Sequence, residues 1–409
     1  MNRNFDYLFG TAGDPLGSSG TFTSDSYRGT GAFSEPESRI LRDFVLSKNF
    51  ETALMHHSAA NSIPHPYGGI PTMVSGRENE MHKWHEDMSR FNRYVSGATI
   101  FSAANGIADD WMLGGVADGN GSVGSGHNIL ASTPEHGHSS EGSTFGQFWP
   151  NPANIVPIAK RAMRINLMNV YYAGQYARLH DLTQSNIPAL TSNLEFGIER
   201  LGQTDSDFTL TVTPISANIT SIASIPTQSG MTVLEQRNLT AEIVLNPTIQ
   251  PNEKIEYRVQ LANDNGVIFY DAIIEKFYQP TVLLTDSGDD LSNWNVTGGN
   301  WTTSTVNPFS GARSISTNAG TGNYANNANS TLTSANSYDF SGANQVLIQF
   351  YTRWDLERNY DFVEIQGSTD GSTWQSLCGI YNKPEAVATS NDSHGGKGCL
   401  LYTSPSPRD

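Results

Sequence analysis

The chain has 409 residues, more than one hydrophobic core usually serves and enough for two or three domains. Its formal net charge is −16, so its surface offers no general attraction for phosphates, and this excludes nucleic acids as partners. No apolar run approaches the roughly 18 residues of a membrane-spanning helix, and no secretory signal is visible at the start of the sequence.

Residues 1 to about 180 have the pattern of a mixed α/β domain. Three stretches carry apolar residues at helical spacing, and Ser34 with Glu37 forms a capping box before the first of them. A short apolar run that ends in two histidines is typical of a strand. The predicted helices are 34–48, 77–97 (with Gly97 as its stop) and 152–177, and the predicted strand is 51–58. Helices that alternate with short strands favour a mixed, mostly parallel sheet flanked by helices.

The second part of the chain reads as all-β. Residues 190–280 are predicted to form a β-sandwich accessory domain from strands with period-2 alternation. These strands are 207–214, 240–247, 254–262 and 266–277. Residues 282–400, with strong strands predicted over 344–354 and 361–377, suit a jelly-roll-like β-domain that ends early. Residues 400–409 resume no strand pattern, which predicts a non-native or disordered tail.

Nine of the ten histidines lie within the first 180 residues, so metal or acid–base chemistry is expected there. Several short segments of this region, taken in order, resemble consecutive signatures of zinc metallocarboxypeptidases of the carboxypeptidase A/B type, in a secreted bacterial multidomain form. They are "NRNFDYLFG" (2–10), "SDSYRG" (24–29), "SEPES" (34–38), "HHSAANSIPHPYGG" (56–69), "GIADDW" (106–111), "TPEHG" (133–137) and "FWPNPANIVPIAKRAMRINL" (148–167). One such motif is weak evidence, whereas six or more in the same order are strong.

The resemblance implies hydrolysis of the C-terminal peptide bond of peptides or proteins, with one Zn²⁺ polarising the scissile carbonyl. His57 matches a zinc ligand of the family, and Glu135 matches its catalytic glutamate, which acts as general base and then general acid. His56 is the neighbour of His57, and adjacent side chains of a strand point to opposite faces. We therefore expect His56 to be packed or hydrogen-bonded elsewhere.

Substrate recognition is implied for four further positions. Asn2 and Arg3 match the pair that holds the substrate's carboxylate, which a guanidinium grips well. Asp109 matches the residue at the base of the pocket for the C-terminal side chain, where a carboxylate favours Lys or Arg. Phe101 lies about where the family carries a mobile tyrosine, so stacking on substrate would remain without the hydroxyl.

The family supplies its other two zinc ligands from an H-x-x-E motif that precedes the Asn-Arg pair, a place where this sequence has only Met1. A catalytic zinc needs three protein ligands. We therefore expect a chain that begins inside the catalytic domain, lacks N-terminal strands, is marginally stable, binds zinc weakly or not at all, and is inactive as given. His138 and Glu141 also spell H-x-x-E, but they follow Glu135 in a Gly/Ser-rich loop, where a histidine is expected to be a solvated loop residue.

Three other features remain open on the sequence. His82, His85 and Glu86 share a helix, where a surface position is expected rather than metal binding. Asp355, Glu357 and Asp361 could hold Ca²⁺ through oxygen ligands or could be solvated carboxylates. The sequence does not decide whether its two cysteines pair, or the oligomeric state. The two cysteines are Cys378 and Cys399.

A different class of function is a surface protein that binds glycans or proteins through its β-domains, with a degenerate peptidase remnant attached. Four tryptophans of the third region could stack on sugars, although aromatic residues of β-domains are usually core. They are Trp294, Trp301, Trp354 and Trp374. A peptidase domain followed by serial β-modules is typical of extracellular or cell-surface proteins.

Overall fold

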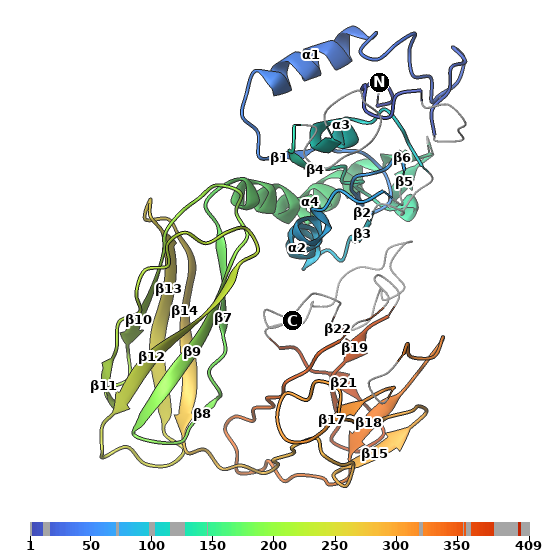
Figure 1. Ribbon diagram of the computed structural model, residues 1–409. Coiled ribbons are helices and arrows are strands. Elements are labelled where there is room, and N and C mark those ends of the chain that lie inside the picture. The colour runs from blue at the N-terminus through green and yellow to red at the C-terminus, as the bar shows by residue number, and fades with distance from the viewer. Residues whose placement is uncertain are drawn as a thin grey trace.

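The computed structural model describes residues 2–10, 17–70, 73–97, 103–114, 127–144, 146–318, 322–354, 356, 361–379 and 400–401. Its helices lie with several short strands at one end of the molecule, with long strands next to them and a third region of short strands beside the long strands (Figure 1). None of the described helices combines the length and the apolar character needed to cross a lipid bilayer.

The helical pattern of the first region is largely confirmed. Its helices are α1 (Pro36–Leu46), α2 (Glu78–Ser89), α3 (Ala108–Gly114) and α4 (Pro152–Ala173). The predicted capping box is wrong, because α1 begins after Glu35 and no side chain caps it. Ser34 Oγ instead donates to Glu35 Oε1 at 2.8 Å and accepts from Asn4 Nδ2 at 3.0 Å, so tertiary contacts use its hydroxyl.

The second helix is shorter than predicted. It ends at Ser89 rather than near residue 97, and Arg93 adopts a left-handed backbone with φ 51° that a helix cannot continue through. Residues Val95–Gly97 form β3, which pairs in parallel with β2 (Ser62–Pro64). Strand pairing therefore overrides the helical period at this point.

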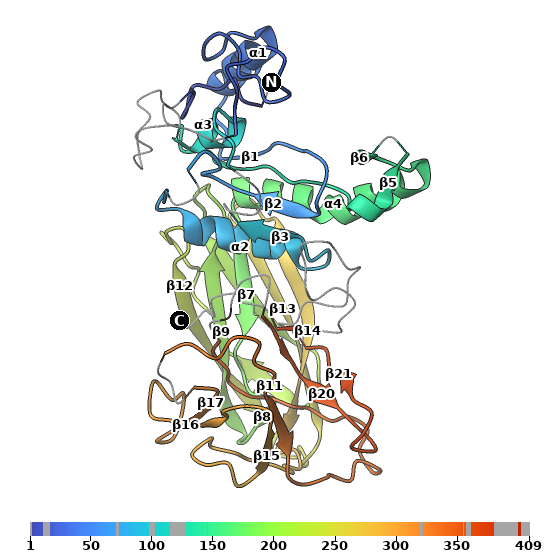
Figure 2. The ribbon, with the colours of Figure 1, turned by 90° about the vertical axis from the view of Figure 1, so that its right-hand side faces the viewer.

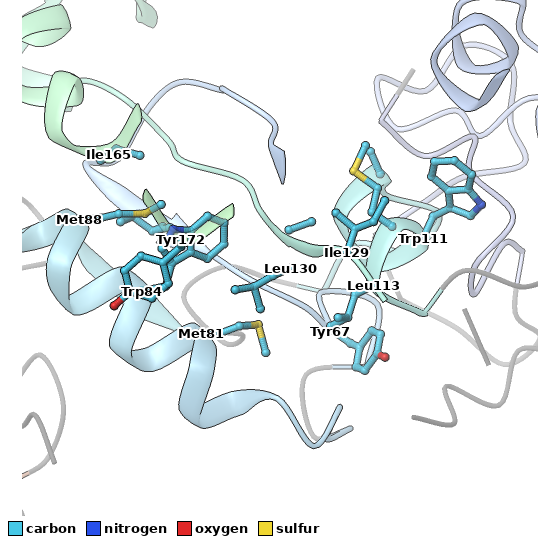
Figure 3. Close-up of a cluster of buried hydrophobic side chains, with 14 of the residues drawn as sticks. Tyr67, Met81, Trp84, Met88, Trp111, Leu113, Ile129, Leu130, Ile165 and Tyr172 are labelled. Atoms are coloured by element: carbon cyan, nitrogen blue, oxygen red, sulfur yellow. The ribbon is translucent and has the colours of Figure 1, made fainter. Parts of the chain in front are cut away.

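Two parallel strand pairs organise the first region. β1 (Thr52–Leu54) pairs with β4 (Leu130–Ser132); β2 pairs with β3. Around them lie Trp84, Leu130 and Trp111, which belong to one buried cluster that reaches from α2 to α3 (Figure 3). A short turn, η1 (Ser139–Glu141), and the hairpin of β5 (Gly142–Ser143) with β6 (Gly146–Pro150) lead into α4.

The long strands form two four-stranded sheets. Their orders are β10-β13-β14-β8 and β11-β12-β9-β7. The strands are β7 (Ala177–Asp181), β8 (Asn186–Ile187), β9 (Thr191–Arg200), β10 (Phe208–Pro214), β11 (Ile219–Ile222), β12 (Gln236–Leu245), β13 (Lys254–Asn263) and β14 (Ile268–Tyr278). All four predicted strands overlap observed ones, and alternate residues of β12 and β13 enter one buried cluster. The proposed division into domains stays a prediction.

The first region is joined to the long strands by buried charges. Both views place α2 and α4 at one end of these strands (Figures 1 and 2). On α2, Asp87 pairs with Arg178 of β7 and accepts from Tyr172 Oη at 2.8 Å. Lys83 Nζ lies 3.0 Å from Glu199 Oε1 of β9, and both side chains are almost fully buried.

The third region consists of short strand pairs in its described residues. They are β15 (Trp294–Thr297) with β18 (Thr331–Ser334), β16 (Thr302–Ser304) with β17 (Ser314–Ser316), β19 (Val363–Glu364) with β22 (Leu400–Leu401), and β20 (Gln366–Gly367) with β21 (Gln375–Ser376). The strand predicted over 344–354 is wrong: it pairs with no described segment, and Ile348 is 65% exposed. An alternating pattern of apolar and polar residues does not form a strand when no other segment provides hydrogen-bonding partners. The jelly-roll fold stays a prediction.

Candidate active site

The site begins where β1 and β4 end, because their parallel pairing continues past both strands. The N–H of Met55 donates to Ser132 O at 2.9 Å, that of His57 to Pro134 O at 2.8 Å, and that of His136 to His57 O at 2.9 Å. This register places His57 directly opposite Glu135. Side chains alternate along a strand, so these two share one face.

His57 and Glu135 face each other on an accessible part of the molecule. His57 Nδ1 lies 3.5 Å from Glu135 Oε1, with 35% and 15% of the side chains exposed. Glu135 is also held from the other side, since its N–H donates to Ser62 O at 2.8 Å and its carbonyl accepts from Ser62 N at 3.1 Å. Its backbone is thus fixed by two strand pairs while its carboxylate remains reachable.

The Asn2-Arg3 segment is held in place by the residues that follow it. The buried Asn4 side chain donates to Arg28 O at 2.7 Å and to Gly31 O at 2.9 Å. Phe5 N–H donates to Gly106 O at 3.0 Å. Gly106 has φ +67°, and a Cβ there would lie 2.5 Å from Arg3 O, so only glycine allows this approach.

Asn2 and Arg3 lie beside the His57–Glu135 pair. Asn2 Oδ1 accepts from Ala108 N at 3.1 Å, and its Nδ2 lies 3.5 Å from His57 Nε2. Arg3 Nε donates to Gly17 O at 2.6 Å and Nη1 to Asn2 O. Burial holds the pKa of Arg3 below its ordinary value, opposed by the charges of Asp109 and Glu135. The guanidinium is therefore a cation near two carboxylates.

Asp109 and Asp110 are both buried but differ in their partners. Asp109 Oδ2 accepts from Thr133 Oγ1 at 3.0 Å, whereas its buried Oδ1 has no hydrogen-bond partner in the described part of the chain. Burial raises the pKa of Asp109, and His57 is among the groups that oppose this rise. Burial, followed by the charge of Asp109, raises the pKa of Asp110, whose oxygens accept from the N–H groups of Gly68 and Gly69 at 2.9 Å each.

The first part of the chain matches a family of known proteins. Residues 1–164 match the family model for zinc carboxypeptidase. This segment belongs to the zinc carboxypeptidase family.

Solved structures that resemble the chain include two related proteins. One is carboxypeptidase A from Helicoverpa armigera, at 23% identity over 42% of this chain and 40% of that one, with a TM-score of 0.34. Another is bovine thrombin-activatable fibrinolysis inhibitor in complex with tick carboxypeptidase inhibitor, at 23% identity over 41% and 54%, with a TM-score of 0.32. The matched part therefore spans 40% and 54% of these two proteins.

The other histidines of the carboxypeptidase segment have contacts of their own. His56 is hydrogen-bonded as predicted, with Nδ1 2.7 Å from His136 Nε2 and Nε2 3.1 Å from Asn166 Oδ1. The expected surface position of His85 is wrong, since it is fully buried, with Nε2 2.7 Å from Ser132 Oγ. An amphipathic period identifies the buried face of a helix only when the element that covers it is known.

The H-x-x-E pair of His138 and Glu141 forms a turn cap. Glu141 accepts from the backbone N–H of His138 at 2.8 Å and pairs with Arg161 at 2.5 Å. His138 Nδ1 lies 2.6 Å from Ser140 Oγ, so the ring is bound within the turn instead of being only solvated. Glu141 serves to join η1 to α4.

The described residues do not complete a zinc site. His57 has the chemistry and exposure of one ligand, but no group of three His, Cys, Asp or Glu side chains among the described residues could hold a metal ion. Phe101 lies outside the described residues, as do Asp355, Glu357 and Cys399. Asp361 accepts from Tyr324 Oη at 2.5 Å, and Cys378 is disulfide-bonded.

Sequence reasoning missed two members of this site. Thr133 donates to Asp109, and His136 bonds His56. Thr133 and His136 lie on either side of Glu135. The strand register would have shown on which face of the strand pair each side chain lies, but the sequence does not give that register.

Proposed function

We propose that the protein is a zinc-dependent carboxypeptidase that removes C-terminal residues, with a preference for Lys and Arg. The observation that carries the proposal is the register that sets His57 opposite Glu135, with Arg3 close enough to Glu135 for their charges to interact. A positive group near an accessible carboxylate suits a substrate that ends in a free carboxylate. The family match of residues 1–164 supports the same chemistry.

Each residue has a distinct proposed role. Glu135 takes a proton from the attacking water and returns it to the leaving amine. Arg3 and Asn2 hold the terminal carboxylate, and His57 is one zinc ligand. Asp109, with a buried oxygen that lacks a donor, pairs with a basic C-terminal side chain. Phe101 is proposed to stack on substrate.

Peptide binding tests recognition without requiring catalysis. We expect a peptide ending in free Arg to bind at least tenfold more tightly than its C-terminal amide, since charge-assisted hydrogen bonds are worth about 1.5–3 kcal/mol. Arg3→Ala should abolish that difference, while Arg42→Ala, a partly exposed residue of α1 that pairs with Asp43, should keep it. Equal affinity for acid and amide would contradict the assignment of Arg3.

Hydrolysis tests the chemistry and the specificity. On an intact version of the enzyme with a complete zinc site, we expect higher kcat/KM for peptides ending in Arg or Lys than for matched peptides ending in Phe. Glu135→Gln should lower kcat by a factor of about 10² to 10⁴ with binding retained, and Asp109→Asn should remove the preference. Equal kcat/KM values on the matched peptides would exclude the role of Asp109.

Zinc content tests the incomplete metal site. We propose that the chain as given binds zinc weakly and is inactive, since His57 is the single ligand proposed within the described part of the chain and three are needed. Elemental analysis after exposure to excess zinc and gel filtration should give well below one equivalent. Stoichiometric zinc would overturn this expectation.

A second candidate function, saccharide binding by the third region, is favoured by a pocket of about 650 Å³. It is lined by amide, hydroxyl and aromatic groups without a charged side chain, which suits neutral sugars. These include Asn300, Trp301, Thr317, Asn323 and Tyr324. Trp301 Nε1 is buried without a partner in the described part of the chain.

A glycan array of neutral oligosaccharides tests the second candidate. We expect binding that Trp301→Ala or Asn300→Ala abolishes and that Trp374→Ala, outside the pocket, leaves unchanged. Binding insensitive to the pocket variants would argue against this site. Extracellular or cell-surface location and a Ca²⁺ ion near Asp361 stay proposals, which fractionation and calcium titration would test.

A further inference from the structure

The face of the extended β1–β4 pairing opposite the catalytic pair carries two more histidines. With His57 opposite Glu135, the register puts His56 and His136 on the other face, diagonal to each other. His56 directly precedes His57, and His136 directly follows Glu135. A hydrogen bond between His56 and His136 therefore links the same two segments that carry His57 and Glu135.

The two outer rings meet edge to edge. His56 Nδ1 and His136 Nε2 are 2.7 Å apart, the ring centroids are 5.0 Å apart, and the planes differ by 25°. Rings stacked face to face with such close nitrogens would have closer centroids, so these distances indicate a nearly in-plane hydrogen bond. Both rings are bound at their far nitrogens too, His56 by Asn166 of α4 and His136 by Tyr94 Oη at 3.4 Å.

The Asn166 amide decides where the protons lie. Its Nδ2 donates to Ala162 O at 3.2 Å, a backbone carbonyl that can only accept, so its Oδ1 faces His56. His56 Nε2 must then carry a hydrogen, and Nδ1 of a neutral His56 accepts from Nε2–H of His136. His136 Nδ1 is left to accept from the Tyr94 hydroxyl.

We propose that His56 and His136 form a clamp of two neutral imidazoles, both protonated at Nε2, that positions His57 and Glu135 across from each other. The clamp joins the two segments beyond the last residues of β1 and β4, where their pairing continues as the bridge between His57 and Glu135. Both residues act through their neighbours, so they are positioning residues. Their catalytic meaning rests on the proposed carboxypeptidase function, whereas their geometry does not.

Nitrogen NMR of the histidine rings tests the protonation pattern. In the full chain without added zinc at pH 7.5, we expect both side chains in the neutral Nε2–H form, with a through-bond correlation from His136 Nε2–H to His56 Nδ1. Finding either ring doubly protonated or protonated at Nδ1 would overturn the proposal. The readout needs neither zinc nor substrate, so failure of the proposed function would leave this result standing.

Amide hydrogen exchange tests positioning against a general effect on stability. In His56→Phe and His136→Phe, we expect exchange of the His57 and His136 amides to speed up on the order of tenfold, the worth of one hydrogen bond. Amides of β12 should be unchanged. His136→Gln, whose amide can donate where Nε2–H did, should restore protection, and His138→Ala should leave it as in the parent chain. Unchanged exchange at His57 and His136, or faster exchange everywhere, would overturn the proposal.

Discussion

Adjacent residues of one type take different roles around Glu135. His57 faces Glu135 while His56 bonds His136 behind it. Asp109 has one buried oxygen with no hydrogen-bond partner among the described residues, and its charge acts on Arg3 and His57, whereas both oxygens of Asp110 accept backbone N–H groups. A buried side chain whose hydrogen bonds are all made within the protein, such as Asp110, stabilises the fold, whereas one with an unused acceptor, such as Asp109, can bind a ligand.

Truncation of Asp110 should lower the stability of the protein much more than truncation of Asp109. Asp110→Ala leaves the buried N–H groups of Gly68 and Gly69 without an acceptor, which should lower the free energy of unfolding by about 2–5 kcal/mol. Asp109→Ala removes a buried, partly unpaired carboxylate and should change it by less than about 1 kcal/mol. Urea unfolding followed by tryptophan fluorescence measures both. Equal losses would show that Asp109 is also structural.

At the scale of elements, α2 is joined to β7 and β9 by charges rather than by apolar contacts alone. Lys83 and Glu199 are each almost fully buried, and Asp87 binds both Arg178 and Tyr172. Burying two charges costs desolvation energy. An intact buried ion pair is therefore much more stable than the same site with one partner removed, but not necessarily more stable than an apolar pair. The pairing therefore specifies how α2 sits on these strands more than it adds stability.

Removing one partner of the buried pair should cost more than removing both. Glu199→Ala removes the buried carboxylate that faces the Lys83 ammonium, so we expect a loss of about 3–5 kcal/mol in the free energy of unfolding. In Lys83→Met/Glu199→Leu the two side chains pack as apolar groups, and stability should be close to that of the parent chain. A double-mutant cycle by urea unfolding provides the test. Additive losses would contradict strong coupling between the two.

At the scale of the whole molecule, the first region and the long strands share a buried boundary that includes a histidine. His180 of β7 is 6% exposed, and burial, followed by the charges of Arg178 and Lys83, lowers its pKa to about 3. The unfolded chain binds a proton at this residue near pH 6.5. His180 therefore contributes stability above about pH 6.5 that is lost as the pH falls toward its folded pKa.

Lowering the pH should reduce the free energy of unfolding through protonation of His180. Between about pH 6.5 and 3, the parent chain should lose up to about 1.4 kcal/mol per pH unit relative to His180→Gln, which does not titrate. The difference in free energy of unfolding between the two should thus shift in favour of the variant as pH falls. Urea unfolding followed by circular dichroism at pH 7, 5.5 and 4.5 measures it. A difference that does not vary with pH would refute this role.

The sequence by itself determined the family of the first region and most of its helices and long strands, because ordered motifs and hydrophobic periods are local properties. It also determined that His56 and His57 must diverge, since adjacent side chains in an extended chain point apart. The end of α2, the burial of His85 and the missing strand at 344–354 were decided only by tertiary structure. Each depends on a partner segment distant in sequence, and the parallel register that joins His57 to Glu135 across 78 residues is the clearest case.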